Sequence, residues 1–170
     1  MQYHPLATVP LLDVSPATRL YDSSLIVEYL DGLSSAGAAL MPRDPAEQLV
    51  VRSNDRLADH VLSTVVTLTW TRHAPEERRS QRRIDEAMRK LEIGLGFFDA
   101  AIRASAGGYV CGAISLADLS LSAAVVTALE DKTLVDLGAW PDLAAWHARL
   151  SNRPAWRWVE ARALSLYRPF

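Results

Sequence analysis

The chain has 170 residues, of which 49% are hydrophobic and 22% charged, and its formal net charge is −2. This composition is typical of a globular protein with one domain or two small ones. The weak negative charge argues against nucleic acid as a partner, and the absence of a long apolar run argues against a membrane-spanning helix. The N-terminus does not have the pattern of a signal peptide, and the single cysteine fits a reducing cytoplasm.

The first segment predicts two short strands followed by a helix. Residues 9–14 read as a strand with a proline at its start, 15–18 as a turn, and 19–21 as a second strand. Apolar residues then recur at helical spacing, so a helix is expected over residues 22–33, opening at "DSS".

Beyond residue 40 the sequence predicts helices only. Asp44 as N-cap, Pro45 in the first turn and Glu47 as the partner in a capping box start a helix that runs to about Trp70. After Pro75, a second long helix is expected over residues 76–104.

The stretch "GAISLADLSLSAAVVTALE" carries the sharpest local signal. Ser115 and Asp118 can form a capping box, flanked by apolar residues that can form a hydrophobic staple. The helix over residues 116–130 is nearly apolar all round, so it should lie at the centre of a helical domain. Another helix is expected over residues 141–150, and a short one after Pro154.

In this order, the segments resemble the cytosolic glutathione S-transferases of the bacterial type. The Val-Pro strand, the turn, the strand ending in acidic-Ser and the helix ending "EYL" resemble the second half of that family's thioredoxin-like domain. "LMPRDP" resembles its linker, "GAISLADLSLSAA" its central capping box, and "WPDLAAWHARLSNRPAW" its closing helices. The resemblance covers nearly the whole chain.

The resemblance implies a mainly α fold, with a partial thioredoxin-like β-β-α unit followed by an all-helical C-terminal domain. The expected division is 1–33 for the β-β-α unit, 34–43 for the linker and 44–170 for the helical domain. The family begins with a strand, a helix and a strand that carry its catalytic Ser, Tyr or Cys. This segment has no counterpart before Val9, so the catalytic residue is unknown.

Four residues are implied to bind glutathione. Val9 would offer its backbone to the cysteinyl part of the ligand, ahead of a cis Pro10; the alternative is a strand that merely starts with proline. Asp22 and Ser23 open a helix, whose N-terminus suits the carboxylate of a γ-glutamyl group, while the Asp22 carboxylate could pair with its ammonium. The alternative is that they only cap the helix, and the two interpretations are compatible.

The remaining candidates are weaker. The resemblance implies that Trp70 borders a pocket for the electrophile. Ser115 and Asp118 are assigned to folding, and Cys111 is either a replacement nucleophile or a small buried residue. The four histidines show no metal-ligand spacing, so no metal is expected.

The resemblance implies a cytoplasmic homodimer without a metal. The resulting hypothesis is a glutathione S-transferase-like protein that transfers the thiol of its co-substrate glutathione to a small electrophile. Two alternatives stay open. One is a non-catalytic scaffold or dimerisation module of the same fold, and the other is an N-terminally truncated gene product.

Overall fold

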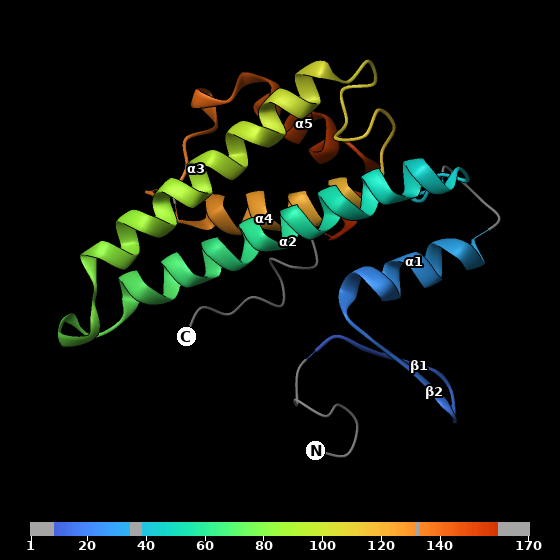
Figure 1. The fold of residues 1–170 in the computed structure, drawn as a ribbon, viewed down its shortest axis with the longest axis horizontal. Helices are drawn as coiled ribbons and strands as arrows, with labels where there is room; N and C mark the ends of the chain where they lie inside the picture. The colour runs from blue at the N-terminus through green and yellow to red at the C-terminus, as the bar shows by residue number, and fades with distance from the viewer. Residues whose placement is uncertain (1–8, 35–38, 132, 160–170) are drawn as a thin grey trace.

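The computed structural model describes residues 9–34, 39–131 and 133–159. Its elements are, in chain order, β1 (Leu11–Ser15), β2 (Thr18–Tyr21), α1 (Ser23–Leu33), α2 (Pro45–His73), the 3-10 turn η1 (Glu76–Arg78), α3 (Gln81–Ala104), α4 (Leu116–Glu130), the 3-10 turn η2 (Leu137–Ala139) and α5 (Pro141–Ser151). Figure 1 shows the hairpin and α1 at one side of a group of long helices, next to the end of α2 where that helix begins.

The expected strand-turn-strand unit is confirmed. β1 and β2 pair antiparallel, with Leu11 opposite Tyr21 and Asp13 opposite Arg19. Asp13 and Arg19 also form an exposed ion pair, with 2.6 Å between Oδ1 and Nε. Pro16 lies in the turn, where its fixed φ suits the second position.

The first long helix starts as expected. The Asp44 carboxylate accepts hydrogen bonds from the amides of Ala46 and Glu47, and Pro45 occupies the first turn of α2. In the described part of the chain no return bond from the Glu47 carboxylate is found, so the capping box is only half formed.

The expected start of the next helix is wrong. Residues 76–78 form the 3-10 turn η1, and α3 begins at Gln81 rather than near Glu76. The reason is local: Pro75 starts a single turn that closes when the Arg79 amide bonds to Glu76, and Ser80 then adopts an extended conformation, with φ −127°, from which α3 begins.

The expected central helix is confirmed as α4. Leu116, Leu121 and Val125 on it are almost completely buried. Ser115 and Asp118 form the capping box, and both the amide and the hydroxyl of Ser115 donate to Asp118 Oδ2 at 2.9 Å. The other oxygen of Asp118 accepts bonds from the Val110 amide at 2.9 Å and from Trp146 Nε1 at 2.8 Å. One buried carboxylate therefore joins the loop before α4, α4 itself and α5.

The buried apolar core lies in the helical part of the chain and in the loops that connect its helices. Among the described residues its members fall between Val51 and Leu150, with Trp146 and Phe98 the largest, and no apolar residue of 9–34 is buried. This distribution supports the division into 1–33, 34–43 and 44–170, which remains a proposal. No helix in the described ranges combines the length and the hydrophobicity needed to cross a membrane.

Asp118→Ala should lower the free energy of unfolding by about 3–5 kcal/mol, because its buried hydrogen-bond donors lose their acceptor. Asp136→Ala is the control: Asp136 caps the exposed turn η2 through the Gly138 amide, and its loss should cost about 1 kcal/mol. Urea denaturation of both variants measures the difference, and equal small losses would contradict the central role of Asp118.

Candidate functional site

The first turn of α1 is shaped by its N-cap, Asp22. Oδ1 of Asp22 accepts hydrogen bonds from the amides of Ser24 at 3.0 Å and Leu25 at 3.3 Å. Asp22 has a φ of 82°, which residues with a side chain seldom adopt, although Asp does so more often than most. The capping interpretation of Asp22 is therefore confirmed, and its second oxygen, Oδ2, is directed toward Arg56 of α2.

The other expected ligand residues lie at the surface near this turn. The Val9–Pro10 peptide bond is cis, which confirms that expectation, and Val9 is 90% exposed. Because Leu11 pairs with Tyr21, the segments just outside that pair, Val9–Pro10 and Asp22–Ser23, lie at the same end of the hairpin. Ser23 is exposed, and within the described residues no hydrogen bond of its hydroxyl is found. Ligand binding by these residues stays a prediction.

A buried carboxylate, Asp55 of α2, lies behind this turn and is only 1% exposed. Its Oδ1 accepts hydrogen bonds from Ser24 Oγ at 2.9 Å and from Ser120 Oγ of α4 at 2.5 Å. Its Oδ2 accepts bonds from Nη2 of Arg56 at 2.9 Å and from Nε at 3.1 Å. These donors compensate a charge that would be costly to bury alone. The Asp55 contacts therefore join α1, α2 and α4, and fix the turn that carries Asp22 and Ser23.

Arg56 connects Asp55 with two carboxylates nearer the surface. Its Nη1 lies 3.5 Å from Asp22 Oδ2 and 3.3 Å from Asp59 Oδ2. Its Nη2 lies 3.5 Å from Asp22 Oδ1. Three carboxylates around one guanidinium leave this cluster with a formal charge of −2.

The two outer carboxylates differ in their ionisation. Desolvation alone would raise the pKa of Asp22, but the Arg56 guanidinium and the amides of Leu25 and Ser24 outweigh it, so this pKa lies below its ordinary value of 3.8. For Asp59, desolvation and the charge of Asp55 raise the pKa above the same ordinary value of 3.8. Asp22 is therefore the more firmly ionised of the two.

Sequence reasoning did not find the Asp55 contacts. A signal for Asp55 itself was present, because Val51, Asp55 and Ala58 follow helical spacing on the buried face of α2, and a charged residue on such a face requires polar partners. The sequence does not predict which residues those partners are, because Ser24 and Ser120 are 31 and 65 residues away in the chain.

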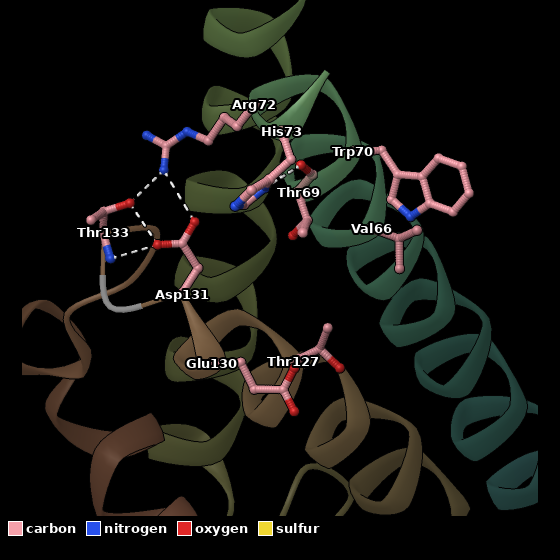
Figure 2. A pocket seen from close by; sticks show the side chains of 9 residues that line it. All are labelled: Val66, Thr69, Trp70, Arg72, His73, Thr127, Glu130, Asp131 and Thr133. Carbon is pink, nitrogen blue, oxygen red and sulfur yellow. Dashed lines mark hydrogen bonds and ion pairs between the residues drawn. The ribbon is translucent and has the colours of Figure 1, made fainter. Parts of the chain in front are cut away.

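Trp70 lies at a different place along the same helix. It borders a hollow of about 700 Å³ between the C-terminal ends of α2 and α4, whose lining residues are Val66, Thr69, Trp70, Arg72, His73, Thr127, Glu130, Asp131 and Thr133. Figure 2 shows its indole projecting from α2, turned away from the hydrogen-bonded group of Arg72, Asp131 and Thr133. Because Trp70 follows Asp55 by 15 residues in α2, the two are about 22 Å apart along the helix axis.

Cys111 lies in the loop before α4 and is partly buried. Desolvation, followed by the charge of Asp118, raises the pKa of its thiol above the ordinary value. The Asn54 side-chain amide donates a weak bond to Sγ at 3.8 Å. Because a thiol with a raised pKa is a poor nucleophile at neutral pH, the structure favours the packed residue over the replacement nucleophile. In the ranges that the structure describes, no group of three or more His, Cys, Asp or Glu side chains is arranged to hold a metal ion.

Asp22→Asn tests the charge on the N-cap, since Asn caps helices as Asp does. The lowered pKa means that the Asp22 charge stabilises the fold above the unfolded-state value near 3.8, and that this contribution is lost as the pH falls through the folded-state pKa. The parent should therefore be more stable than the variant at pH 7, and the two should converge below pH 3.8. Urea unfolding at a series of pH values measures this, and a difference independent of pH would rule it out.

Asp55→Ala should loosen α1 from the other helices, because the buried Ser24 hydroxyl loses its acceptor; the free energy of unfolding should fall by about 2–4 kcal/mol. Amide hydrogen exchange should accelerate more in α1 than in α5. Arg52→Gln is the control, because the exposed Arg52–Glu28 pair also joins α1 and α2 and should contribute little. Equal acceleration in α1 and α5 would show that Asp55 supports the whole bundle rather than α1.

Comparison with known proteins gives the family. The family described as "Glutathione S-transferase, C-terminal domain" matches residues 60–157, more than half of the chain. The GST-like protein YibF of Escherichia coli (strain K12) is 33% identical over 91 residues, which cover 54% of this chain and 43% of that protein. Glutathione S-transferase 2 of Saccharomyces cerevisiae is 28% identical over 160 residues, and the match covers 87% of this chain and 65% of that protein. The chain thus spans less than two thirds of the length of either relative.

A solved structure gives the same fold. The glutathione S-transferase from Methylobacillus flagellatus KT, solved with GSH bound, matches with a TM-score of 0.83 at 28% identity, covering 92% of this chain and 77% of that one. The expected fold class, a partial thioredoxin-like unit followed by the all-helical C-terminal domain, is confirmed. The chain belongs to the glutathione S-transferase family.

Proposed function

We propose that this chain binds glutathione at the start of α1 and takes part in transferring its thiol to a small electrophile. The observation that carries the proposal is the first turn of α1, where an ionised Asp22 lies beside the exposed Ser23 and Asp55 holds the turn in place. The relative from Methylobacillus flagellatus with GSH bound supports glutathione as the ligand. The chain spans less than two thirds of the length of the two curated relatives, so an activity like that of a full-length relative is itself part of the proposal.

The charges at this turn suit the two ends of an amino-acid group. The γ-glutamyl ammonium would pair with Asp22 Oδ2, and the γ-glutamyl carboxylate with the amide and hydroxyl of Ser23, where the helix dipole also favours an anion. The backbone of Val9, beside Pro10 at the same end of the hairpin, would pair with the cysteinyl part as an added strand does.

The reaction needs the glutathione sulfur as a thiolate. The thiol gives up its proton, and the sulfur attacks the electrophilic carbon, forming a C–S bond while an electron pair departs with the leaving group or moves to the adjacent atom. A hydroxyl or thiol near the sulfur would stabilise the thiolate, and we assign this role to no described residue. Glutathione is the co-substrate and the proposal includes no metal. The reducing cytoplasm, which keeps the thiol free, is the proposed location.

The electrophile is proposed to lie along α2. Asp59, Leu62 and Val66 follow Asp55 at helical spacing and so project from the same side of this helix. Val66 and Trp70 then border the hollow shown in Figure 2. The apolar side chains of Leu62, Val66 and Trp70 suit the apolar part of an electrophile, while most of the side chains that line the hollow are polar.

A non-catalytic scaffold or dimerisation module is the second candidate, favoured by exposed apolar side chains. Leu25, Leu30 and Leu33 on α1 and Ile93 and Phe97 on α3 are each about half exposed or more. Apolar surface of this kind commonly marks a protein interface, and we propose that the chain forms a homodimer in either case. The two candidates differ in glutathione binding, which a pure scaffold would not require.

Ser23→Ala should weaken glutathione binding about tenfold or more without lowering the thermal midpoint, because the exposed hydroxyl would donate to a charged carboxylate. Ser53→Ala, on the exposed side of α2, is the matched control and should bind as the parent does. Calorimetric titration measures both, and unchanged affinity in folded Ser23→Ala would exclude the proposed position of the carboxylate.

A further inference from the structure

The outer end of Arg56 lies between two carboxylates from different parts of the fold. Its Nη1 is 3.5 Å from Asp22 Oδ2 at the start of α1, and 3.3 Å from Asp59 Oδ2 on α2. The inner edge of the same guanidinium is held more closely, with Nη2 and Nε at 2.9 and 3.1 Å from the buried Asp55. Arg56 is therefore anchored at Asp55 and makes only long contacts outward.

The two oxygens of Asp22 are used differently. Oδ1 already accepts the amides of Ser24 and Leu25, and Nη2 of Arg56 lies 3.5 Å from it. Oδ2 contacts Nη1 of Arg56 at 3.5 Å, longer than a good charge-assisted hydrogen bond. Oδ2 is thus the atom through which Asp22 can bind a cation, and a cationic nitrogen already lies beside it.

We propose that Arg56 is a specificity-determining residue of the glutathione site, because its Nη1 lies where the ligand's ammonium binds between Asp22 and Asp59. This inference rests on the proposed function and deepens it. Asp59 becomes a second carboxylate for the ammonium, and Arg56 becomes the internal competitor that the ammonium has to displace. The formal charge of −2 on the cluster favours the arrival of one more positive group.

Competition with Arg56 makes the site selective for ligands that carry a positive charge. Because the guanidinium is a rigid plane, an ammonium that displaces Nη1 turns the whole group, while the hydrogen bond from Ser24 to Asp55 that holds α1 is kept. A γ-glutamyl compound whose amine is acylated has no charge with which to replace Nη1 and gains nothing from either carboxylate. The site should therefore select compounds with a free α-amino group.

Arg56→Gln tests the competition, since Gln keeps a donor for Asp55 and removes the outer positive charge. The probe is 4-aminobutyryl-cysteinylglycine, which has the ammonium of glutathione and lacks its α-carboxylate. Attraction between Arg56 and that carboxylate therefore does not contribute to the measured affinity. The variant should bind this probe about fivefold to tenfold more tightly than the parent does. N-acetylglutathione should bind equally weakly to both, and Arg52→Gln, one helical turn away, should behave as the parent.

Asp59→Asn keeps the inference testable if Arg56→Gln fails to fold. It removes the charge of Asp59, whose pKa desolvation and the charge of Asp55 raise, so the fold should be retained. It should weaken both glutathione and the probe about fivefold. Two results would overturn the inference and leave the proposed function standing, provided that the parent binds glutathione. One is that Arg56→Gln binds the probe no more tightly than the parent does. The other is that Asp59→Asn binds both ligands as the parent does. If the parent binds neither ligand, the proposed function fails and this inference fails with it.

Discussion

The hydrogen bond between the Ser24 hydroxyl and the buried Asp55 carboxylate decides where the start of α1 lies. Among the described residues, no apolar side chain of 9–34 is fully buried, so hydrophobic burial holds this unit less firmly than it holds the helices. Apolar contacts alone would also position it loosely, because they have little directional preference. A hydrogen bond to a buried charge is strong and directional, so it fixes the turn that carries Asp22 and Ser23.

The site depends on the helical core through a short series of contacts. Asp118 ties the loop before α4 to α4 and α5, and so sets the position of the central helix. α4 brings Ser120 to Asp55, and Asp55 in turn holds Ser24. One helix, α2, carries Asp55, Arg56, Asp59 and one side of the hollow near Trp70, so the proposed ligand site and the proposed electrophile site share one helix.

The features that could be predicted from sequence are those set by near neighbours. The caps of α2 and α4 are local, since Asp44 and Ser115 act within three residues, and the central helix was placed correctly for that reason. The start of α3 was misplaced because Pro75 is compatible with either a helix or a single turn. The contacts of Asp55 could not be predicted, because nothing in the sequence near Asp55 specifies a partner 31 or 65 residues away. The resemblance points to Asp22 and Ser23, and only the structure shows that Arg56 contacts both Asp22 and Asp59.

Calorimetric titration of glutathione into the 170-residue chain, with the thermal midpoint followed in parallel, tests the central claim most directly. We predict saturable binding in the micromolar to low-millimolar range and a midpoint that rises with glutathione concentration, because a ligand that binds only the folded chain stabilises it. A folded, helical chain that releases no binding heat and shows no change in its midpoint would contradict the account.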